Sequence, residues 1–164
     1  MSESKVHFYS NEPLAALLGN PNCGKTALFN LLTGSRQKVA NYSGVTVERK
    51  EGRLSLDSGK NIRILDLPGA YSLYPRSLDE KVTCNVLLGR AEGEKRPDLV
   101  VCILSAMNLR RNLRLVLAAK RLGLPCVVVL NMLDLAKRQD LEINTDELIS
   151  IDLQVLTLSK VQHI

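Results

Sequence analysis

The sequence predicts an α/β fold of three layers, in which helices cover both faces of a mostly parallel sheet. Two observations lead to this prediction: short apolar runs of strand length recur along the chain, and segments with helical spacing of apolar residues lie between them. Because strands that alternate with helices are joined by right-handed crossovers, neighbouring strands should run parallel. The 164 residues, 45% of them hydrophobic, suffice for one domain with a continuous core.

The expected strands are short stretches rich in apolar or β-branched residues. They cover residues 14–18, 46–56, 61–67, 99–104, 126–130 and 155–158. The second and third should form a hairpin, because the turn Asp57-Ser58-Gly59 separates them. Residues 35–45 have no periodicity and predict an irregular segment before the hairpin. The polar stretch 137–147 predicts a connection before the last strand.

Helices are expected between these strands, over residues 25–33, 77–88 and 108–122. The residues expected on their buried faces are Leu28, Leu31 and Leu32 in the first, Leu78, Val82, Val86 and Leu87 in the second, and Leu109, Leu113, Val116 and Leu117 in the third. The last helix also carries Arg110, Arg111 and Arg114. A solvated face is the favoured interpretation of these arginines, with docking to RNA, a membrane or a second subunit as alternatives.

The composition argues against several classes of protein. A formal net charge of +5, from 22 basic and 17 acidic residues, is a mild excess, and a chain without Trp lacks the aromatics of a base-stacking surface. The four cysteines have no C-x-x-C spacing, and His7 and His163 are isolated, so no zinc, disulfide or iron site is expected. Residues 1–12 are polar, and no apolar run approaches the ~20 residues of a membrane-spanning helix. We therefore expect a cytosolic domain with no nucleic-acid partner.

A glycine-rich motif lies between the first expected strand and the first expected helix. It matches G-x-x-x-x-G-K-T and consists of Gly19, Asn20, Pro21, Asn22, Cys23, Gly24, Lys25 and Thr26, with Ala27 directly after it. Its glycines let successive backbone N–H groups and the helix N-terminus face phosphates. Lys25 should reach the β- and γ-phosphates, and the Thr26 hydroxyl should ligate Mg²⁺. The motif therefore predicts a P-loop that binds a nucleoside triphosphate.

Two further segments supply the other groups that a triphosphate and its Mg²⁺ need. In Asp66-Leu67-Pro68-Gly69, Asp66 would hold Mg²⁺ through a water and the Gly69 N–H would meet the γ-phosphate. The Thr46 hydroxyl would complete the Mg²⁺ shell, and its N–H, next to Gly44 and Val45, would sense the γ-phosphate. Residues 35–47 would then be a switch that is ordered with triphosphate and released on hydrolysis.

A third motif, Asn131-Met132-Leu133-Asp134, directly follows the expected strand 126–130 and selects the base. Guanine donates hydrogens from N1 and N2 that one carboxylate such as Asp134 accepts together, whereas adenine has no such donor pair. Asn131, Met132 and Asp134 therefore predict GTP or GDP as the ligand. Ala70 stands where many switch GTPases carry a water-orienting glutamine, so intrinsic hydrolysis should be slow.

Together these motifs resemble the N-terminal G domain of the bacterial ferrous-iron transporter family FeoB. The resemblance covers about residues 14 to 160, and its most specific parts are the segments N-Y-S-G-V-T-V-E at 41–48 and D-L-P-G-A-Y-S-L at 66–73. It implies a P-loop NTPase fold of the Ras-like type, a single GTP-binding domain over residues 1–164, and K⁺-stimulated hydrolysis with Asn22 as a K⁺ ligand. The implied catalytic residues are Lys25, Asn22, Thr46 and Gly69, and the implied metal-binding residues are Thr26, Thr46, Asp66 and Asn22.

The resemblance also implies partners and a location. In the family a helical domain and a membrane-embedded region follow the G domain, and GTP hydrolysis is tied to Fe²⁺ uptake at the cytoplasmic face of the bacterial inner membrane. Neither region is expected in this chain, and a homo-oligomer is possible. Leu158, Ser159 and Lys160 would form the loop at guanine O6, although Lys160 stands where the family often has Ala.

Two other interpretations stay open on the residues alone. A translation or tRNA-modification GTPase of the same cation-assisted kind would share the P-loop, Ala70 and N-x-x-D, and salt-dependent RNA binding would favour it. A non-hydrolysing sensor would exchange GTP and GDP to regulate an attached partner. The absence of turnover in both K⁺ and Na⁺ would favour the sensor.

Overall fold

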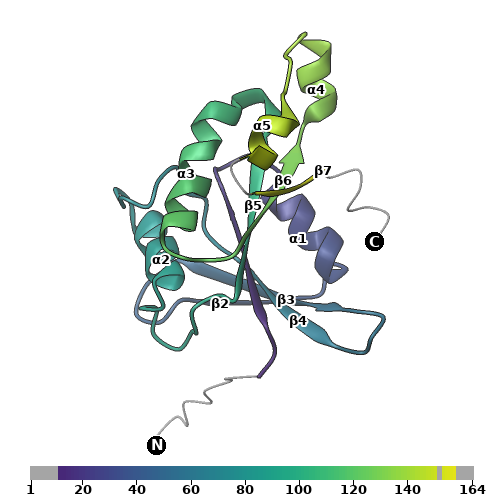
Figure 1. Ribbon diagram of the computed structural model, residues 1–164. Helices are drawn as coiled ribbons and strands as arrows, with labels where there is room; N and C mark the ends of the chain where they lie inside the picture. The colour runs from purple at the N-terminus through teal and green to yellow at the C-terminus, as the bar shows by residue number, and fades with distance from the viewer. Residues whose placement is uncertain (1–10, 151–152, 158–164) are drawn as a thin grey trace, which may run out of the picture.

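The computed structural model describes residues 11–150 and 153–157, which form a seven-stranded sheet between two layers of helices (Figure 1). The strand order is β2-β3-β4-β1-β5-β6-β7. The strands are β1 (Leu14–Gly19), β2 (Gln37–Asn41), β3 (Glu48–Ser55), β4 (Asn61–Asp66), β5 (Leu99–Ser105), β6 (Cys126–Asn131) and β7 (Gln154–Thr157). Only β3 pairs antiparallel with its neighbours, β2 and β4, among the described strands; the other pairs are parallel. The predicted three-layer α/β fold with a mostly parallel sheet is confirmed.

The helices lie on both faces of this sheet. They are α1 (Lys25–Thr33), α2 (Leu78–Leu87), the 3₁₀ turn η1 (Ala106–Asn108), α3 (Leu109–Arg121), α4 (Leu133–Arg138) and α5 (Thr145–Ser150). Helix α1 covers one face, and α2, α3 and α5 contribute to the core on the other face. The three helices expected from the sequence are confirmed, with ends that differ by no more than one residue.

Strand β1 forms the centre of the sheet and is buried along its whole length. Leu14, Ala16 and Leu18 point into the core on the α2 and α3 side, whereas Ala15 and Leu17 point toward α1. Its backbone pairs with β4 on one side and with β5 on the other. A strand covered on both faces appears in the sequence as a continuous apolar run, which is why this strand was predictable.

The segment 35–45 was expected to be irregular, but Gln37–Asn41 within it forms the edge strand β2. All of its residues are exposed, and antiparallel pairing with β3 holds it in place. A strand with no buried face has no reason to alternate apolar and polar residues, so its sequence carries no strand pattern. The next strand begins at Glu48 rather than at Thr46, because Thr46 belongs to the loop between β2 and β3.

Residues 133–150 contain two short helices that were not predicted from the sequence. Helices α4 and α5 are six residues each. Helix α4 buries Ala136, and α5 buries Leu148 among the residues whose side chains are described. One buried side chain cannot define a helical stripe, and the surrounding residues are polar, so the segment looked like a connection.

The buried faces of the predicted helices differ in part from expectation. In α1, Phe29 is fully buried, whereas Leu31 is 43% exposed. In α3, Leu115 is buried and Leu117 is exposed, and in α2 Leu78 is exposed. Helices rich in leucine carry apolar residues on several sides, so the sequence allows more than one stripe and the contact with the sheet selects one.

Phe29→Ala should lower the free energy of unfolding by about 3–5 kcal/mol, because it removes a fully buried ring from the core beside β1. Leu31→Ala, on the same helix, is the matched control and should cost less than about 1 kcal/mol. Urea denaturation followed by circular dichroism measures both values. A larger loss for Leu31→Ala than for Phe29→Ala would contradict this assignment of the buried face.

Candidate functional site

The loop between β1 and α1 wraps around the N-terminus of α1. Gly24, the N-cap residue, has a φ of 95°, and Asn22 has a φ of 63°, so the loop uses two left-handed residues. The first turn of α1 contains no acidic side chain. No carboxylate from within this turn therefore competes for its backbone N–H groups or for the positive end of the helix dipole, which suits a bound anion.

The side chains of this loop divide into buried and exposed ones. Cys23 packs into the core beside α1, and burial raises the pKa of its thiol. Asn20 is also buried, and its side-chain oxygen accepts no hydrogen bond from the described residues. Pro21, Asn22 and Ala27 are exposed. Among these residues, Asn22 presents an amide group at the surface of the loop.

An ion pair joins the loop to the end of β4. The Lys25 Nζ atom lies 2.5 Å from Asp66 Oδ1, and the two side chains are only 12% and 7% exposed. Parallel pairing of β4 with β1 brings these residues together, although they are 41 positions apart in the sequence. The predicted P-loop lysine and the predicted Mg²⁺ aspartate are therefore neighbours.

A cavity of about 400 Å³ opens beside this ion pair. Its lining residues are Lys25, Thr26, Thr46, Val47, Glu48, Lys50, Asp66, Leu67, Pro68 and Asp79. The structure thus brings together the predicted ammonium group, both predicted threonine hydroxyls and the predicted carboxylate. Glu48, Lys50 and Asp79 were not predicted, because charged residues at the ends of strands and helices are too common to indicate a site.

Thr46 lies on a tight loop that is anchored at both ends. The Tyr42 N–H donates to the Val47 carbonyl over 2.9 Å, and the Val45 N–H donates to the Tyr42 carbonyl over 3.3 Å. The side chains of Tyr42 and Val47 are buried, whereas Gly44 and Thr46 are exposed. The loop therefore presents Thr46 to the cavity from a base that is fixed in the core. We call residues 42–47 the Thr46 loop.

The segment after Asp66 runs along the P-loop. The Ala70 N–H donates to the Gly19 carbonyl over 3.1 Å, and a Cβ atom on Gly69 would lie 2.9 Å from Pro21 Cγ. Gly69 is thus required by the close approach of two backbone segments. Ala70 is fully buried, so the methyl group at this position does not reach the cavity.

Glu80 of α2 shapes the next part of this segment. Its carboxylate accepts hydrogen bonds from the N–H groups of Tyr71 and Arg76, at 3.2 Å and 2.9 Å. The N–H of Arg76 contributes most to holding the pKa of Glu80 below its usual range, and the N–H of Tyr71 contributes next. Glu80 was not predicted from the sequence, although Ser77-Leu78-Asp79-Glu80 has the S-x-x-E pattern of a capping box. The Ser77 hydroxyl does accept from the Glu80 N–H.

The N-x-x-D motif is joined to the P-loop from the other side. The Asn131 Nδ2 group donates to the Cys23 carbonyl over 3.1 Å, and Asn131 Oδ1 accepts from the Met132 N–H over 2.8 Å. A Cβ atom on Gly24 would lie 2.1 Å from Asn131 Nδ2, so this contact also requires glycine there. Asp134 is exposed in the first turn of α4. Leu158, Ser159 and Lys160 lie outside the described residues.

The residues of the cavity suit an Mg²⁺ ion that is bound mainly by phosphate oxygens and waters. Thr26, Thr46 and Asp66 supply hard oxygen atoms, which Mg²⁺ prefers. In the described part of the chain, no group of three or more His, Cys, Asp or Glu residues could hold a metal ion by itself. Mg²⁺ commonly takes few protein ligands and completes its octahedral shell with phosphate oxygens and waters, so the residues present fit this ion.

A larger cavity of about 920 Å³ lies between residues 71–77 and α3. Its lining includes Arg76, Arg111 and Arg114 but neither Lys25 nor either of the threonines of the smaller cavity. The smaller cavity is the better candidate for nucleotide chemistry, because it combines phosphate-binding and Mg²⁺-binding groups at the end of a P-loop. No helix in residues 11–150 and 153–157 is long and apolar enough to cross a membrane.

Comparisons with known proteins agree with this geometry. The family model described as ferrous iron transport protein B matches residues 14–163. The Fe(2+) transporter FeoB of Escherichia coli K12 is 50% identical over 136 residues, which are 80% of this chain and 17% of that protein. FeoB of Salmonella typhimurium is 48% identical with the same coverage. The chain therefore spans about a sixth of the length of these curated relatives.

Solved structures give the same result. The cytosolic domain of Legionella pneumophila FeoB superposes with a TM-score of 0.81 at 40% identity, covering 88% of this chain and 56% of that one. The G domain of Thermotoga maritima FeoB has a TM-score of 0.77 at 37% identity, with 89% and 86% covered. A Streptococcus thermophilus NFeoB mutant bound to GDP has a TM-score of 0.79 at 42% identity, with 88% and 54% covered. The chain belongs to the family of N-terminal G domains of ferrous iron transport protein B.

Proposed function

We propose that this domain binds GTP and hydrolyses it slowly to GDP and phosphate, with stimulation by K⁺. The observation that supports this most directly is the 400 Å³ cavity, where the Lys25 ammonium, the hydroxyls of Thr26 and Thr46 and the Asp66 carboxylate meet at the N-terminus of α1. These are the groups that a nucleoside triphosphate and Mg²⁺ require. The GDP bound to the Streptococcus thermophilus relative supports a guanine nucleotide.

In this proposal the P-loop binds the phosphates through its backbone, and Lys25 turns from Asp66 toward the β- and γ-phosphate oxygens. Asp66 would then be free to hold Mg²⁺ through a water, and the hydroxyls of Thr26 and Thr46 would ligate the ion. Bound Mg²⁺ supplies positive charge that neutralises the phosphates. The Gly69 N–H, fixed beside Pro21, donates to the γ-phosphate.

Base selection rests on Asp134 with Asn131 as its support. Asp134 accepts the N1 and N2 hydrogens of guanine, and the Asn131 amide keeps the N-x-x-D motif against the P-loop through the Cys23 carbonyl. Adenine would leave the carboxylate without a donor pair, which costs binding energy. Leu158, Ser159 and Lys160 would close the site around guanine O6.

Hydrolysis in this domain proceeds without a glutamine that orients water, since Ala70 is buried at that position. The proposed substitute is Asn22, whose exposed amide oxygen would hold K⁺ beside the phosphates. Bound K⁺ adds positive charge where other GTPases use an arginine. Lys25, the Thr46 backbone and the Gly69 N–H complete the groups that stabilise charge on the transferred phosphoryl group.

The names of the curated relatives suggest the cellular role. They are Fe(2+) transporters, and this chain corresponds to 17% of the E. coli protein. We propose that the domain acts at the cytoplasmic face of the bacterial inner membrane as part of such a protein. Its nucleotide state would regulate Fe²⁺ uptake through the attached helical and membrane-embedded regions.

Single-turnover GTP hydrolysis should be about tenfold faster or more in K⁺ than in Na⁺ at equal ionic strength. Asn22→Gly should reduce the K⁺ rate to the Na⁺ rate while GDP affinity is kept. Glycine is the suitable replacement because Asn22 has a φ of 63°, which alanine would adopt only with strain.

Equal wild-type rates in the two salts would overturn the K⁺ proposal, and no turnover in either salt would favour a nucleotide sensor. A K⁺ response that survives in Asn22→Gly would exclude Asn22 as the ligand.

Asp134→Asn should weaken GDP binding roughly 10- to 150-fold, because two charge-assisted hydrogen bonds to guanine are lost. The same change should improve binding of xanthosine diphosphate, whose C2 carbonyl accepts from the new amide group while N1–H still donates. Isothermal titration calorimetry measures both affinities. Asp140→Asn is a matched control with the same loss of charge, two residues after α4 ends, where the φ of 53° suits asparagine. Unchanged GDP affinity in Asp134→Asn would contradict its role.

A further inference from the structure

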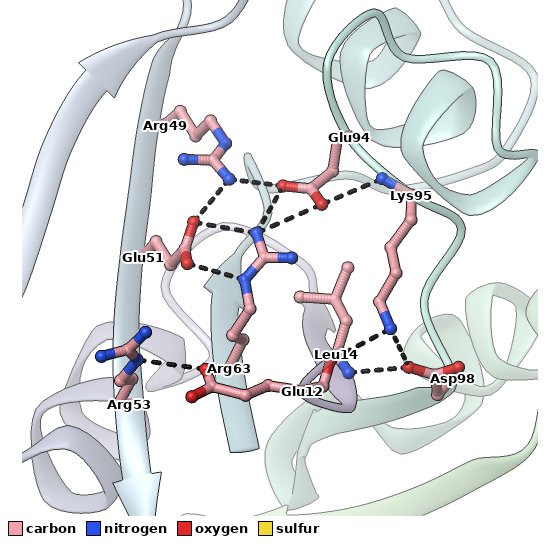
Figure 2. Close-up of polar contacts among 9 residues, drawn as sticks. All are labelled: Glu12, Leu14, Arg49, Glu51, Arg53, Arg63, Glu94, Lys95 and Asp98. Atoms are coloured by element: carbon pink, nitrogen blue, oxygen red, sulfur yellow. Dashed lines mark hydrogen bonds and ion pairs between the residues drawn. The ribbon is translucent and has the colours of Figure 1, made fainter. Parts of the chain in front are cut away.

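A cluster of four charged residues joins strands β3 and β4 to a later connection of the chain, and none of the four lines the cavity of the candidate site. It consists of Arg49 and Glu51 of β3, Arg63 of β4 and Glu94 of the connection between α2 and β5 (Figure 2). Arg63 donates to Glu51 over 2.8 Å and to Glu94 over 3.1 Å, and Arg49 donates to Glu51 over 2.5 Å. Arg49 also forms an ion pair with Glu94. We call these residues the charged cluster.

The charged cluster is balanced in charge, and two of its four members are buried. The side chains of Arg63 and Glu94 are only 6% and 3% exposed. Burial raises the pKa of Glu51, but the hydrogen bond from Arg63 and the charge of Arg49 outweigh burial and hold the pKa below its usual range. Two guanidinium groups between two carboxylates offset the cost of burial only while all partners are present. Loss of one carboxylate would leave the buried Arg63 and the partly buried Arg49 to share the other.

Glu94 is the member of the charged cluster that comes from outside the β3–β4 hairpin, and its own segment is firmly held. Lys95 donates to the Glu12 carbonyl over 3.1 Å and pairs with Asp98 over 2.8 Å. Arg96 donates to the carbonyls of Leu87, the last residue of α2, and of Leu122, which directly follows α3. Residues 94–96 therefore connect the start of β1, two helices and the hairpin, and they give Glu94 a fixed position.

Arg49 connects this fixed position to the Thr46 loop. It follows Thr46 by three residues and Val47, the anchor of that loop, by two. The other anchor, Tyr42, lies near the same charges: burial is the main cause of its raised pKa, which Arg49 lowers and Glu94 raises further. The Tyr42 hydroxyl is buried and has no hydrogen-bond partner among the described residues. The loop is thus held by the buried side chains of Tyr42 and Val47 and by backbone hydrogen bonds, and the Tyr42 hydroxyl adds no bond to them.

We propose that Glu94 is a positioning residue for Thr46: by holding Arg49, it fixes the start of β3 and so keeps the Thr46 loop where Thr46 reaches the Mg²⁺ and γ-phosphate of bound GTP. This inference rests on the proposed function, since it adds a second support to the same site. Because Thr46 contacts groups that GTP has and GDP lacks, a displaced loop lowers affinity for the triphosphate selectively. A change that affects only one of two ligands must act through a contact that distinguishes them.

The test compares Glu94→Gln with Arg53→Gln. Glutamine keeps the size of Glu94 and removes its charge. The control residue Arg53 lies on β3, the strand of Arg49 and Glu51, where it forms an ion pair with Glu12 and is 61% exposed. Calorimetry with Mg²⁺ gives the affinity for a non-hydrolysable GTP analogue and for GDP. In Glu94→Gln we expect analogue affinity to fall roughly 3- to 30-fold and GDP affinity to change less than about twofold. Arg53→Gln should change neither.

A double-mutant cycle with Thr46→Ala separates positioning from general stability. If Glu94 acts through Thr46, Glu94→Gln should cause little further loss of analogue affinity in the Thr46→Ala background. Equal losses for analogue and GDP, or a full extra loss in Thr46→Ala, would overturn the role of Glu94. Wild-type protein that binds neither nucleotide would instead overturn the proposed function.

If Glu94→Gln does not fold, Glu94→Asp keeps the charge but shortens the reach to Arg49, and the same pair of affinities applies to it.

Discussion

The rest of the structure depends on the burial of β1 between β4 and β5. Because its side chains fill both cores and its backbone pairs in parallel on both sides, β1 cannot shift without disturbing every layer. Parallel pairing also makes the carboxyl ends of these strands converge at one edge of the sheet. The P-loop that begins at Gly19 therefore brings Lys25 to Asp66 of β4, and Asn131 of β6 bonds to the same loop at Cys23. The order and direction of the strands therefore bring the motifs of the candidate site together at one edge of the sheet.

Close contacts with neighbouring segments then explain two glycines of the site, Gly24 and Gly69. Gly24 leaves room for the Asn131 amide, and Gly69 leaves room for Pro21, so each glycine marks a contact between two motifs. The P-loop is held by the N-x-x-D motif and by the D-x-x-G motif at once. A loop fixed on two sides presents its N–H groups in a set geometry, so that little reorganisation is needed when an anion binds.

The sequence predicted the parts of the fold that bury both faces and the parts of the site that need a fixed spacing. Strand β1 and the P-loop were predictable because burial and phosphate chemistry each restrict the residues allowed. Strand β2 was not, since pairing alone holds an exposed edge. Asp79 and Glu94 were also missed, because a single carboxylate becomes informative only when the fold brings its partners near. The roles of Asn22 and Ser159 stay predictions, and Ser159 lies outside the described residues.

The Thr46 loop combines a firm base with an exposed tip, and this combination suits a switch. Tyr42 and Val47 are buried, while Thr46 is exposed and lines the cavity with groups from three other segments. If the whole loop were buried, the binding of a γ-phosphate could not change it, and if its base were free, the ordering of the loop would cost most of the binding energy. The ion pairs of the charged cluster are well placed to hold the end of this loop that leads into β3. A planar guanidinium group forms several hydrogen bonds at once and so keeps a fixed orientation. The charged cluster thus complements the cavity: the cluster holds β3, where the loop ends, and the cavity is where the tip of the loop would meet a bound nucleotide.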